Sequence, residues 1–394
     1  MILPSVDEAP TILSQSVQFD PNCDFDAFLK DVPAKWVVYL MTDEADRPVQ
    51  LLCVKNLRYS LKRRLGDGAP AGLSKRVDYR QLVRHIRWQR VCSAFEADIV
   101  YLEAARQFFP QTYRGVTGFQ PAWFIHVNPD AKFPRYTRTI DLDIKSGQLI
   151  GPVEDKHAAA RLIENVVDWF DLCRYHNILI QSPHGTACAY KEMGKCPSPC
   201  DGSISIEQYR YLVQWSMESL VAPERLIQDV TDRMRQAAAE QQFESAAKIK
   251  SYVDSMSQLG KGPFRHVRKL SDFKFLSIQR GPRDETAKVF LITPGQIEEI
   301  AGLISPPLHP AELLKIAFSL GTDINITSLD QIGAERVGVI SHHLFQPKTT
   351  QGIFPPLDSI DEKAIIKAFR DVQKQKKEEP AEETEGVVKE LQAL

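Results

Sequence analysis

The segment "CAYKEMGKCPSPC", from Cys188 to Cys200, carries three of the seven cysteines of the chain, and a fourth precedes it at Cys173. The positions Cys173, Cys188, Cys196 and Cys200 are separated by 14, 7 and 3 residues. Four thiolates are the ligand set of a tetrahedral zinc site or of an iron–sulfur cluster. Structural zinc sites usually combine two close cysteine pairs, and this segment has one. The spacing therefore favours an iron–sulfur cluster, with zinc and four reduced structural cysteines as the alternatives.

The composition around this segment is that of an ordinary globular protein. The 394 residues suffice for two to three domains, with 43% hydrophobic and 25% charged residues. The first thirty residues have neither a basic start nor an apolar run, so no secretory signal is expected. No segment approaches the roughly 18 apolar residues of a membrane helix. We expect a cytoplasmic protein without membrane contact, in which reduced cysteines are free to bind metal.

The hydrophobic pattern predicts an α+β fold made of consecutive units. The predicted division is an N-terminal extension (1–30), a small α/β unit (31–150), a helix with the four-cysteine metal region (151–205), a helical region (206–262), a small C-terminal α/β unit (263–350) and a largely disordered charged tail (351–394). In the C-terminal unit, helices are expected around 296–304, 310–319 and 328–342. We find no functional assignment for that unit in the sequence.

A basic stretch lies in the first unit, although the net charge of the chain is only −2. Between Lys55 and Arg90 there are eleven lysines and arginines against two aspartates, with Tyr59, Tyr79 and Trp88 interleaved. This mixture suits a phosphate backbone with stacked bases, so DNA binding with a steep salt dependence is predicted, and a solvated helix face is the alternative. The candidate DNA-binding residues are Lys55, Arg58, Lys62, Arg63, Arg64, Arg84 and Arg87.

Two stretches resemble the middle of the bacterial excinuclease subunit UvrC. They are "GPVEDKHAAARLIENVVDWFDLC" (151–173) and "CAYKEMGKCPSPCDGSISIEQYRYLV" (188–213). In that family a glycine-proline start, an amphipathic helix and a "Y-x-x-G-x-C-x-x-P-C" run followed by a helix occur in this order. The resemblance includes all four cysteines and implies that they hold an iron–sulfur cluster, most simply one with four irons and four sulfides.

The next stretch, "RMRQAAAEQQFESAAKIKSYVDSM" (233–256), is similar to the UVR motif of the same family. The resemblance implies a two-helix hairpin that pairs with the same motif of UvrB. A hairpin of this size cannot bury its own apolar face, which independently favours a partner surface, while packing of that face inside the chain is the alternative. The candidate partner-binding residues are Met234, Ala238, Phe243 and Ala247.

The first unit is similar to the GIY-YIG nuclease domain that opens UvrC, but its motif is incomplete. The resemblance implies catalytic roles for Tyr39, at the first tyrosine position, and for Glu103, at the position that binds a divalent metal. Gln50 stands at the second tyrosine position, and Ser60 falls where the family has its catalytic arginine. We therefore predict a GIY-YIG-like fold with an impaired nuclease site, which would bind a divalent metal at Glu103 only if the nuclease is active.

Three functions remain open from the sequence. The first is a UvrC-like protein of nucleotide excision repair that binds DNA and a UvrB-like protein. The second is an active, shortened endonuclease that makes a single metal-dependent incision. The third is a non-catalytic protein-interaction adaptor. No small-molecule substrate is expected, because the chain has no phosphate-cradling glycine loop and no Ser/His/Asp signature.

Overall fold

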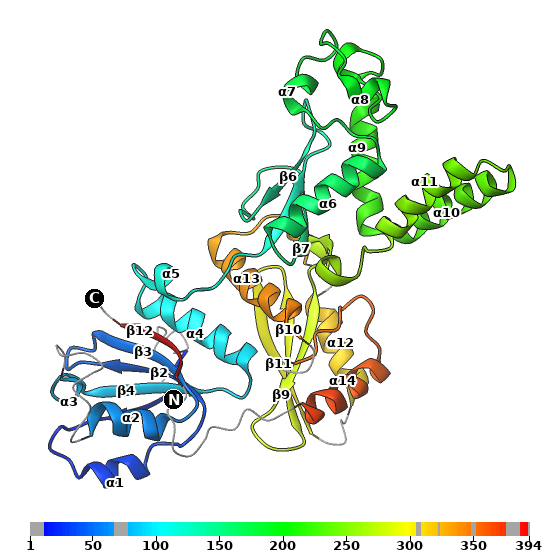
Figure 1. Cartoon of the computed structure of the whole chain (residues 1–394). Coiled ribbons are helices and arrows are strands. Elements are labelled where there is room, and N and C mark those ends of the chain that lie inside the picture. Colours follow the sequence, from blue (N-terminus) through cyan, green and yellow to red (C-terminus); the bar gives the residue numbers. More distant parts are fainter. Residues whose placement is uncertain are drawn as a thin grey trace, which may run out of the picture.

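The computed structural model describes residues 12–66, 78–304, 309–321, 324–347, 352–375 and 387–392. Two sheets with their helices form the lower part of the molecule in Figure 1, and a third sheet begins an arm that rises above them. A pair of helices projects sideways from this arm. Within the described residues, no helix is both long and apolar enough to cross a membrane.

The N-terminal unit is built on a five-stranded antiparallel sheet. Its order is β1 (Gln15–Gln18), β4 (His85–Arg90), β2 (Val37–Thr42), β3 (Pro48–Val54) and β12 (Val387–Gln392). The turn between β2 and β3 is fixed by the Asp43 carboxylate, which accepts hydrogen bonds from the backbone N–H groups of Ala45 and Arg47.

Helices cover both faces of this sheet. Because side chains alternate along a strand, Tyr39 and Leu52 point to one face and Leu40 and Leu51 to the other. The Tyr39 face packs against helices at the bottom of Figure 1, and the Leu40 face packs against the long helix above the sheet. The first group is α1 (Phe25–Lys30), α2 (Leu57–Leu65) and α3 (Tyr79–Leu82), and the second is α4 (Ala94–Phe108), which is followed by α5 (Tyr113–Val116).

The N-terminal extension predicted at 1–30 is part of this unit. Its residues from 12 onward include β1, which pairs with β4, and α1, whose Phe28 and Leu29 are buried against the sheet. The apolar side chains of this segment gain enough burial to fix it on the domain. Residues 1–11 lie outside the described residues.

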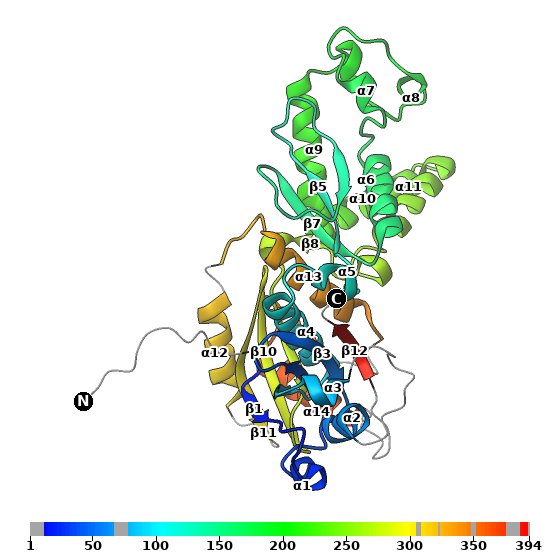
Figure 2. The same ribbon diagram turned by 90° about the vertical axis from the view of Figure 1, so that its left-hand side faces the viewer.

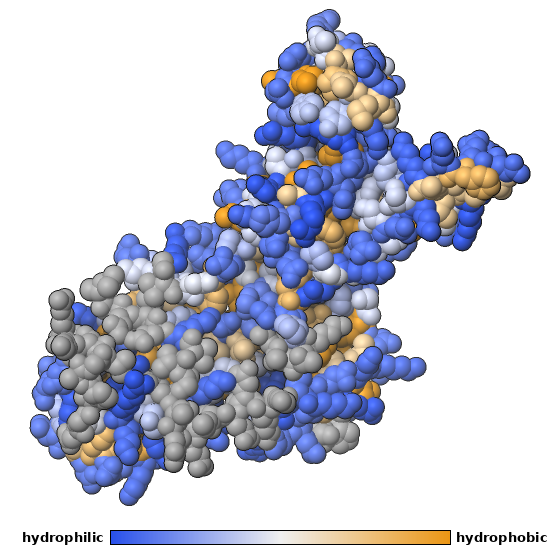
Figure 3. Space-filling view, in the orientation of Figure 1, coloured by the Kyte–Doolittle hydropathy of each residue, from blue (hydrophilic) through white to orange (hydrophobic). Residues whose placement is uncertain are grey.

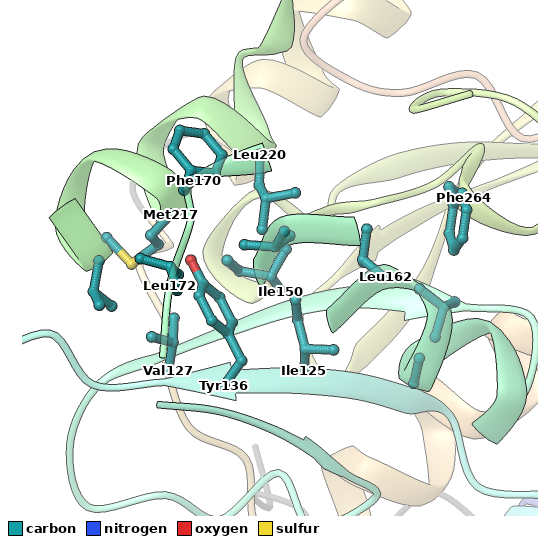
Figure 4. Packing of buried hydrophobic residues seen from close by; sticks show 14 of the residues in the cluster. Ile125, Val127, Tyr136, Ile150, Leu162, Phe170, Leu172, Met217, Leu220 and Phe264 are labelled. Carbon is teal, nitrogen blue, oxygen red and sulfur yellow. The ribbon is translucent and has the colours of Figure 1, made fainter. Parts of the chain in front are cut away.

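The arm is built on a four-stranded sheet, in the order β6 (Tyr136–Thr139), β5 (Trp123–Val127), β7 (Gln148–Val153) and β8 (Arg268–Lys269). Two helices cover it, α6 (Lys156–Trp169) and α9 (Ile206–Val221), and α9 begins with a capping box formed by Ser205 and Gln208. Figure 4 shows the core between these layers.

The predicted boundary at residue 150 is therefore misplaced. The predicted first unit included β5, β6 and the start of β7, but their buried side chains Ile125, Val127 and Ile150 pack against Leu162 of α6 and Leu220 of α9 (Figure 4). The boundary lies near residue 120, because hydrophobic contact and not strand spacing decides which sheet a strand joins.

The projecting pair in Figure 1 consists of α10 (Pro223–Ala239) and α11 (Phe243–Met256). The connection is tight: the backbone N–H of Gln242 donates to the carbonyl of Ala237 at 2.9 Å, and Gln241 has a positive φ of 60°. The predicted helical hairpin is confirmed.

The C-terminal unit holds a three-stranded antiparallel sheet, β11 (Gln296–Ile304), β10 (Thr286–Thr293) and β9 (Phe275–Arg280). Helices α12 (Pro310–Gly321) and α14 (Glu362–Lys374) pack on one face, and α13 (Gln331–Phe345) and α4 pack on the other. Figure 2 shows α12 on the side of β10 away from α4. Short 3-10 turns at Gly262–Phe264 and Leu270–Asp272 lead into the sheet.

Two predictions for this part of the chain are wrong. Residues 296–304 form strand β11 instead of a helix, because Gly295, with φ of 74°, closes a hairpin that pairs them with β10. The tail predicted to be largely disordered from 351 onward contains α14 and β12. Helix α14 forms because its apolar side chains Ile365, Phe369 and Val372 are buried on the sheet while its charges face solvent.

Candidate functional site

The four-cysteine segment lies at the tip of the arm, where α7 (His176–Leu179), α8 (Ala189–Glu192) and the 3-10 turn η1 (Pro199–Asp201) follow one another (Figure 1). Its backbone doubles back on itself, since the N–H of Gly185 donates to the carbonyl of Cys200 at 2.8 Å. Ser198 and Gly202 flank η1 with φ of 58° and 82°. Left-handed backbone at Ser198 is uncommon outside glycine, and it turns Cys200 inward.

Three of the four thiols interact in this fold. A hydrogen bond with Cys196 raises the pKa of Cys173, and the same bond with Cys173 lowers the pKa of Cys196 to about 7. Cys200 also acts electrostatically on Cys173, and its Sγ lies 3.5 Å from Oγ of Ser198. Cys188 is the residue before the first turn of α8. All four are free thiols.

The described residues, which include the whole cysteine segment, contain no group of three His, Cys, Asp or Glu side chains arranged to hold a metal ion. The donor chemistry is that of a soft metal centre, because the four residues are free thiols of one folded segment. The predicted iron–sulfur cluster and its zinc alternative stay predictions.

The candidate nuclease residue Tyr39 takes part in a buried polar network. Its hydroxyl lies 2.6 Å from Oγ of Ser60, which also accepts a 3.0 Å hydrogen bond from Nη1 of Arg64. Nε of Arg64 donates to Oε1 of Gln50 at 3.2 Å. Arg64 is only 8% exposed, and the other three side chains are fully buried. The positions that differ from the nuclease motif thus satisfy one another inside the domain.

The candidate metal ligand Glu103 lies on the opposite side of the sheet from Tyr39. It belongs to α4, which packs on the Leu40 face, and its side chain is 17% exposed. Oε1 accepts a 2.7 Å hydrogen bond from Nε of Arg336 in α13, and Oε2 is paired with Arg106. The structure does not bring Tyr39 and Glu103 together, and both carboxylate oxygens of Glu103 are bonded to guanidinium groups.

Most of the predicted DNA-binding arginines bond to the protein itself. Arg58 donates to the carbonyl of Val32 at 2.9 and 3.0 Å, and Arg84 donates to the carbonyls of Gln81 and Val83 at 2.8 Å.

The remaining candidates differ in their exposure. Arg87 pairs with Asp46 at 2.6 Å, and Lys55 lies over the ring of Trp36. Lys62 is exposed and Arg63 half-buried on α2. Two further bases of the same stretch, Lys75 and Arg76, lie outside the described residues.

The hairpin presents the predicted partner-binding residues to solvent. Phe243 is 68% exposed, Ala238 and Ala247 are exposed, and Met234 is half-buried. The space-filling view shows pale orange residues along this projection (Figure 3).

Sequence reasoning missed the bases that the C-terminal unit places on α4. Lys288 of β10 binds Glu96 at 2.7 Å, and Arg336 of α13 binds Glu103. Asp98 is held from two sides, by Nε2 of His343 at 2.9 Å and by Nζ of Lys389 in β12 at 2.7 Å. These partners are about 190 to 290 positions apart in the chain, so no local pattern could have indicated them.

Comparison with known proteins locates two regions of similarity. Residues 122–219 match the family described as UvrC/Cho excinuclease, middle domain, and residues 224–258 match the UvrB/uvrC motif. The first match begins where the structure places the boundary between the two sheets.

Several curated relatives carry the name UvrABC system protein C. That of Lachnospira eligens is 22% identical over 275 residues, which are 68% of this chain and 44% of the relative. That of Acetivibrio thermocellus is 23% identical over 274 residues (68% and 43%), and that of Synechococcus sp. is 26% identical over 249 residues (59% and 37%). The matches thus span less than half the length of these relatives. No solved structure matches the chain. The predicted resemblance to this family is confirmed.

Proposed function

We propose, from the relationship of this chain to the UvrC family, that it is a UvrC-like protein of nucleotide excision repair. In this proposal it binds DNA and a UvrB-type protein, while its GIY-YIG-like unit is impaired as a nuclease. The observation that carries the proposal is the projecting hairpin, whose sequence matches the UvrB/uvrC motif and whose apolar residues are exposed. The impaired nuclease and the partner are argued below from separate contacts.

The hairpin has the properties of a protein-binding surface. Ala237 and Ala246 are buried at the contact between α10 and α11, so the two helices are already packed together. Phe243, Ala238 and Ala247 remain outside that contact. Small side chains allow close approach of another helix, and a large exposed aromatic at the first residue of α11 can anchor it. The partner proposed for this surface is a second hairpin of the same motif, from a UvrB-type protein.

The test is binding of the full-length protein to purified UvrB by calorimetry. Phe243→Ala is expected to weaken binding by about thirtyfold, the effect of removing an aromatic hot spot. Tyr211→Ala is the matched control, because Tyr211 of α9 is 72% exposed and lies outside the hairpin. An intact protein that does not bind UvrB, or a Phe243→Ala variant that binds as well as the intact chain, contradicts the proposal.

The impaired nuclease is argued from the two candidate catalytic side chains. A metal-dependent nuclease needs a carboxylate open to the metal and a base and cation converging on the same phosphate. Glu103 has both oxygens bonded to arginines, and Tyr39 is buried on the other face of the sheet. We expect no incision of damaged or nicked duplex with Mg²⁺ or Mn²⁺. Metal-dependent incision that Glu103→Ala abolishes would instead support the active, shortened endonuclease.

The DNA contact is proposed to use the exposed bases of α2, of which Lys62 is the clearest. Exposed lysines bind phosphates electrostatically and release counterions, so affinity should fall steeply with salt. An affinity that is flat in salt, or no binding at all, would favour the adaptor function.

The cofactor is proposed to be an iron–sulfur cluster held by Cys173, Cys188, Cys196 and Cys200. When bound, such a cluster crosslinks the loops between α6 and α9 through its iron–sulfur bonds. The protein supplies four free thiols, of which Cys200 lies in the turn η1. A visible spectrum with iron and zinc assays on anaerobically purified protein is the test, and zinc without iron would indicate the zinc alternative.

A further inference from the structure

We propose that a pocket beside the cysteine segment receives an unstacked nucleobase of bound DNA. The pocket has a volume of about 460 Å³, and its lining residues come from β6, α6, α9 and the chain entering α7 in the arm. This inference rests on the proposed binding of DNA, but it concerns a different part of the molecule from α2 and from the hairpin.

The size and walls of the pocket suit a flat organic ring. Its volume lies within the range of small-molecule sites, which are mostly apolar with a few polar groups. The rings of Tyr136 and Tyr209 line it together with aliphatic side chains. The aliphatic lining residues are Ile163, Val167, Leu172, Leu179 and Val213.

The tyrosine hydroxyls are already satisfied by the protein. The hydroxyl of Tyr136 lies 2.7 Å from Oγ of Ser216, and that of Tyr209 accepts the backbone N–H of Cys173 at 3.1 Å. These bonds fix the positions of both side chains, of which Tyr136 is 8% and Tyr209 1% exposed. An occupant would therefore contact the rims of these tyrosines without leaving a hydroxyl unpaired.

One polar group of the lining lacks a partner. Nδ1 of His176 is buried and has no hydrogen-bond partner among the described residues. Buried polar atoms in folded proteins are nearly always paired, so an unpaired one marks a place where a bonding group is missing. A nucleobase edge carries both donors and acceptors and can pair with either tautomer of the ring.

The charged side chains of the lining have both signs. Arg174 is paired with Asp168, whereas Arg135 and Glu164 are exposed and have no ion-pair partner within the described part of the chain. Arg135 can bind the phosphate to which a base is tethered, and Glu164 can accept from an exocyclic amino group. A free anion would be repelled by Glu164, and a purely apolar ligand would leave both Arg135 and Glu164 without a polar contact to the ligand.

The base must leave the helix stack to enter this pocket. Unstacking a paired base costs free energy, and this cost is lowest for a base that is already unpaired. The proposal therefore predicts preference for DNA with a bulged or mismatched nucleotide over the fully paired duplex.

The experiment compares a fluorescein-labelled duplex with the same duplex carrying one bulged 2-aminopurine. Full-length protein should bind the bulged DNA about tenfold more tightly, a factor consistent with stacking of one base, and should change the 2-aminopurine fluorescence. Ile163→Trp, which fills the pocket from α6, should abolish both effects without weakening binding to the paired duplex. Ile227→Trp is the matched control, because Ile227 of α10 packs against the same core but does not line the pocket.

A second pair of variants covers misfolding of the tryptophan variant. Arg135→Glu changes an exposed residue of the pocket and should lower the preference for bulged DNA several-fold, whereas Arg161→Glu, on the exposed side of α6, should leave it unchanged. Binding of both DNAs with equal affinity overturns the pocket and leaves the proposed DNA function standing. Failure to bind either DNA overturns both. Loss of the preference in the control variants Ile227→Trp and Arg161→Glu also overturns the pocket. The pocket is likewise overturned if, in a competition experiment, free amino acids displace the bulged base and adenosine 5′-monophosphate does not.

Discussion

The arm and the N-terminal sheet unit differ in whether their candidate functional side chains are exposed or bonded inside the protein. In the arm, Phe243 of the hairpin stays exposed, whereas the cysteine loop at the tip buries Cys196 and Cys200 and leaves Cys173 and Cys188 half-buried. In the sheet unit, the residues at the positions of the predicted GIY-YIG motif are turned inward. There Arg64 bonds to Ser60 and Gln50, and Ser60 bonds to Tyr39. A buried polar group that is hydrogen-bonded inside the protein is not available for chemistry. Breaking its hydrogen bonds would leave it buried and unsatisfied, which costs free energy.

The contrast extends to the helix that follows the sheet. Glu96, Asp98 and Glu103 of α4 each contact a base of the C-terminal part of the chain. The C-terminal unit therefore covers the outer face of α4, and no unit covers the outer face of the hairpin within the described residues. The two surfaces thus differ in their contacts: the acidic residues on the outer face of α4 are paired within the chain, whereas the outer face of the hairpin is uncovered.

The largest expected effect concerns the tip of the arm. Cys196→Ser with Cys200→Ser removes two thiols that the proposed cluster needs, so iron bound per chain should fall from about four to near zero. Iron analysis and the visible spectrum after anaerobic purification measure it. Cys23→Ser with Cys92→Ser, two cysteines of the sheet unit, is the matched control and should keep the iron. Iron retained by the first variant would exclude this segment as the cluster site.

The next effect tests the buried network of the sheet unit. Arg64→Met keeps the length of the side chain but leaves Ser60 and Gln50 without their donor, which should lower the free energy of unfolding by about 3 kcal/mol. Lys62→Met on the exposed side of the same helix should change it by less than about 0.5 kcal/mol. Urea unfolding measures both. Equal effects would mean that the Arg64 bonds contribute nothing to stability.

A smaller effect is expected at Asp98, where the C-terminal unit closes α4. Burial acts to raise the pKa of this carboxyl, but the hydrogen bond from His343 and the charge of Lys389 outweigh it, so the pKa is lowered. The carboxylate thus stabilises the fold above its ordinary pKa, and this contribution is lost as the pH falls through the lowered value. Asp98→Asn should cost about 2 kcal/mol near neutral pH and less in acid. Urea unfolding of both proteins from neutral to acidic pH measures this difference in unfolding free energy. A difference that grows in acid would contradict a lowered pKa of Asp98.

The smallest effect concerns the DNA contact of the sheet unit. Lys62→Gln should reduce the slope of log affinity against log salt by about one, the contribution of a single phosphate contact. Arg58→Gln is the informative comparison, because Arg58 already donates to Val32 and should leave the slope unchanged. Titration of labelled duplex at several salt concentrations measures both slopes. A larger change for Arg58 than for Lys62 would place the DNA on the other side of α2.

The sequence by itself determined the elements whose signals are local. The hairpin of β2 and β3 follows from two apolar runs around a turn, and the pair α10 and α11 follows from helical periodicity. The four close cysteines marked a segment of special chemistry, and the cluster that their spacing favours stays a prediction.

Only the tertiary structure decided which elements meet. The strands after residue 120 joined a second sheet, residues 296–304 became a strand, and β12 was added beside β3, because these outcomes depend on partners far away in the chain. The same holds for Glu103. The family resemblance implied that it binds a metal, but in the fold its carboxylate is bonded to Arg336 of α13. Local periodicity fixes what a segment forms, whereas burial and pairing across the chain fix what its side chains contact, and contact decides function.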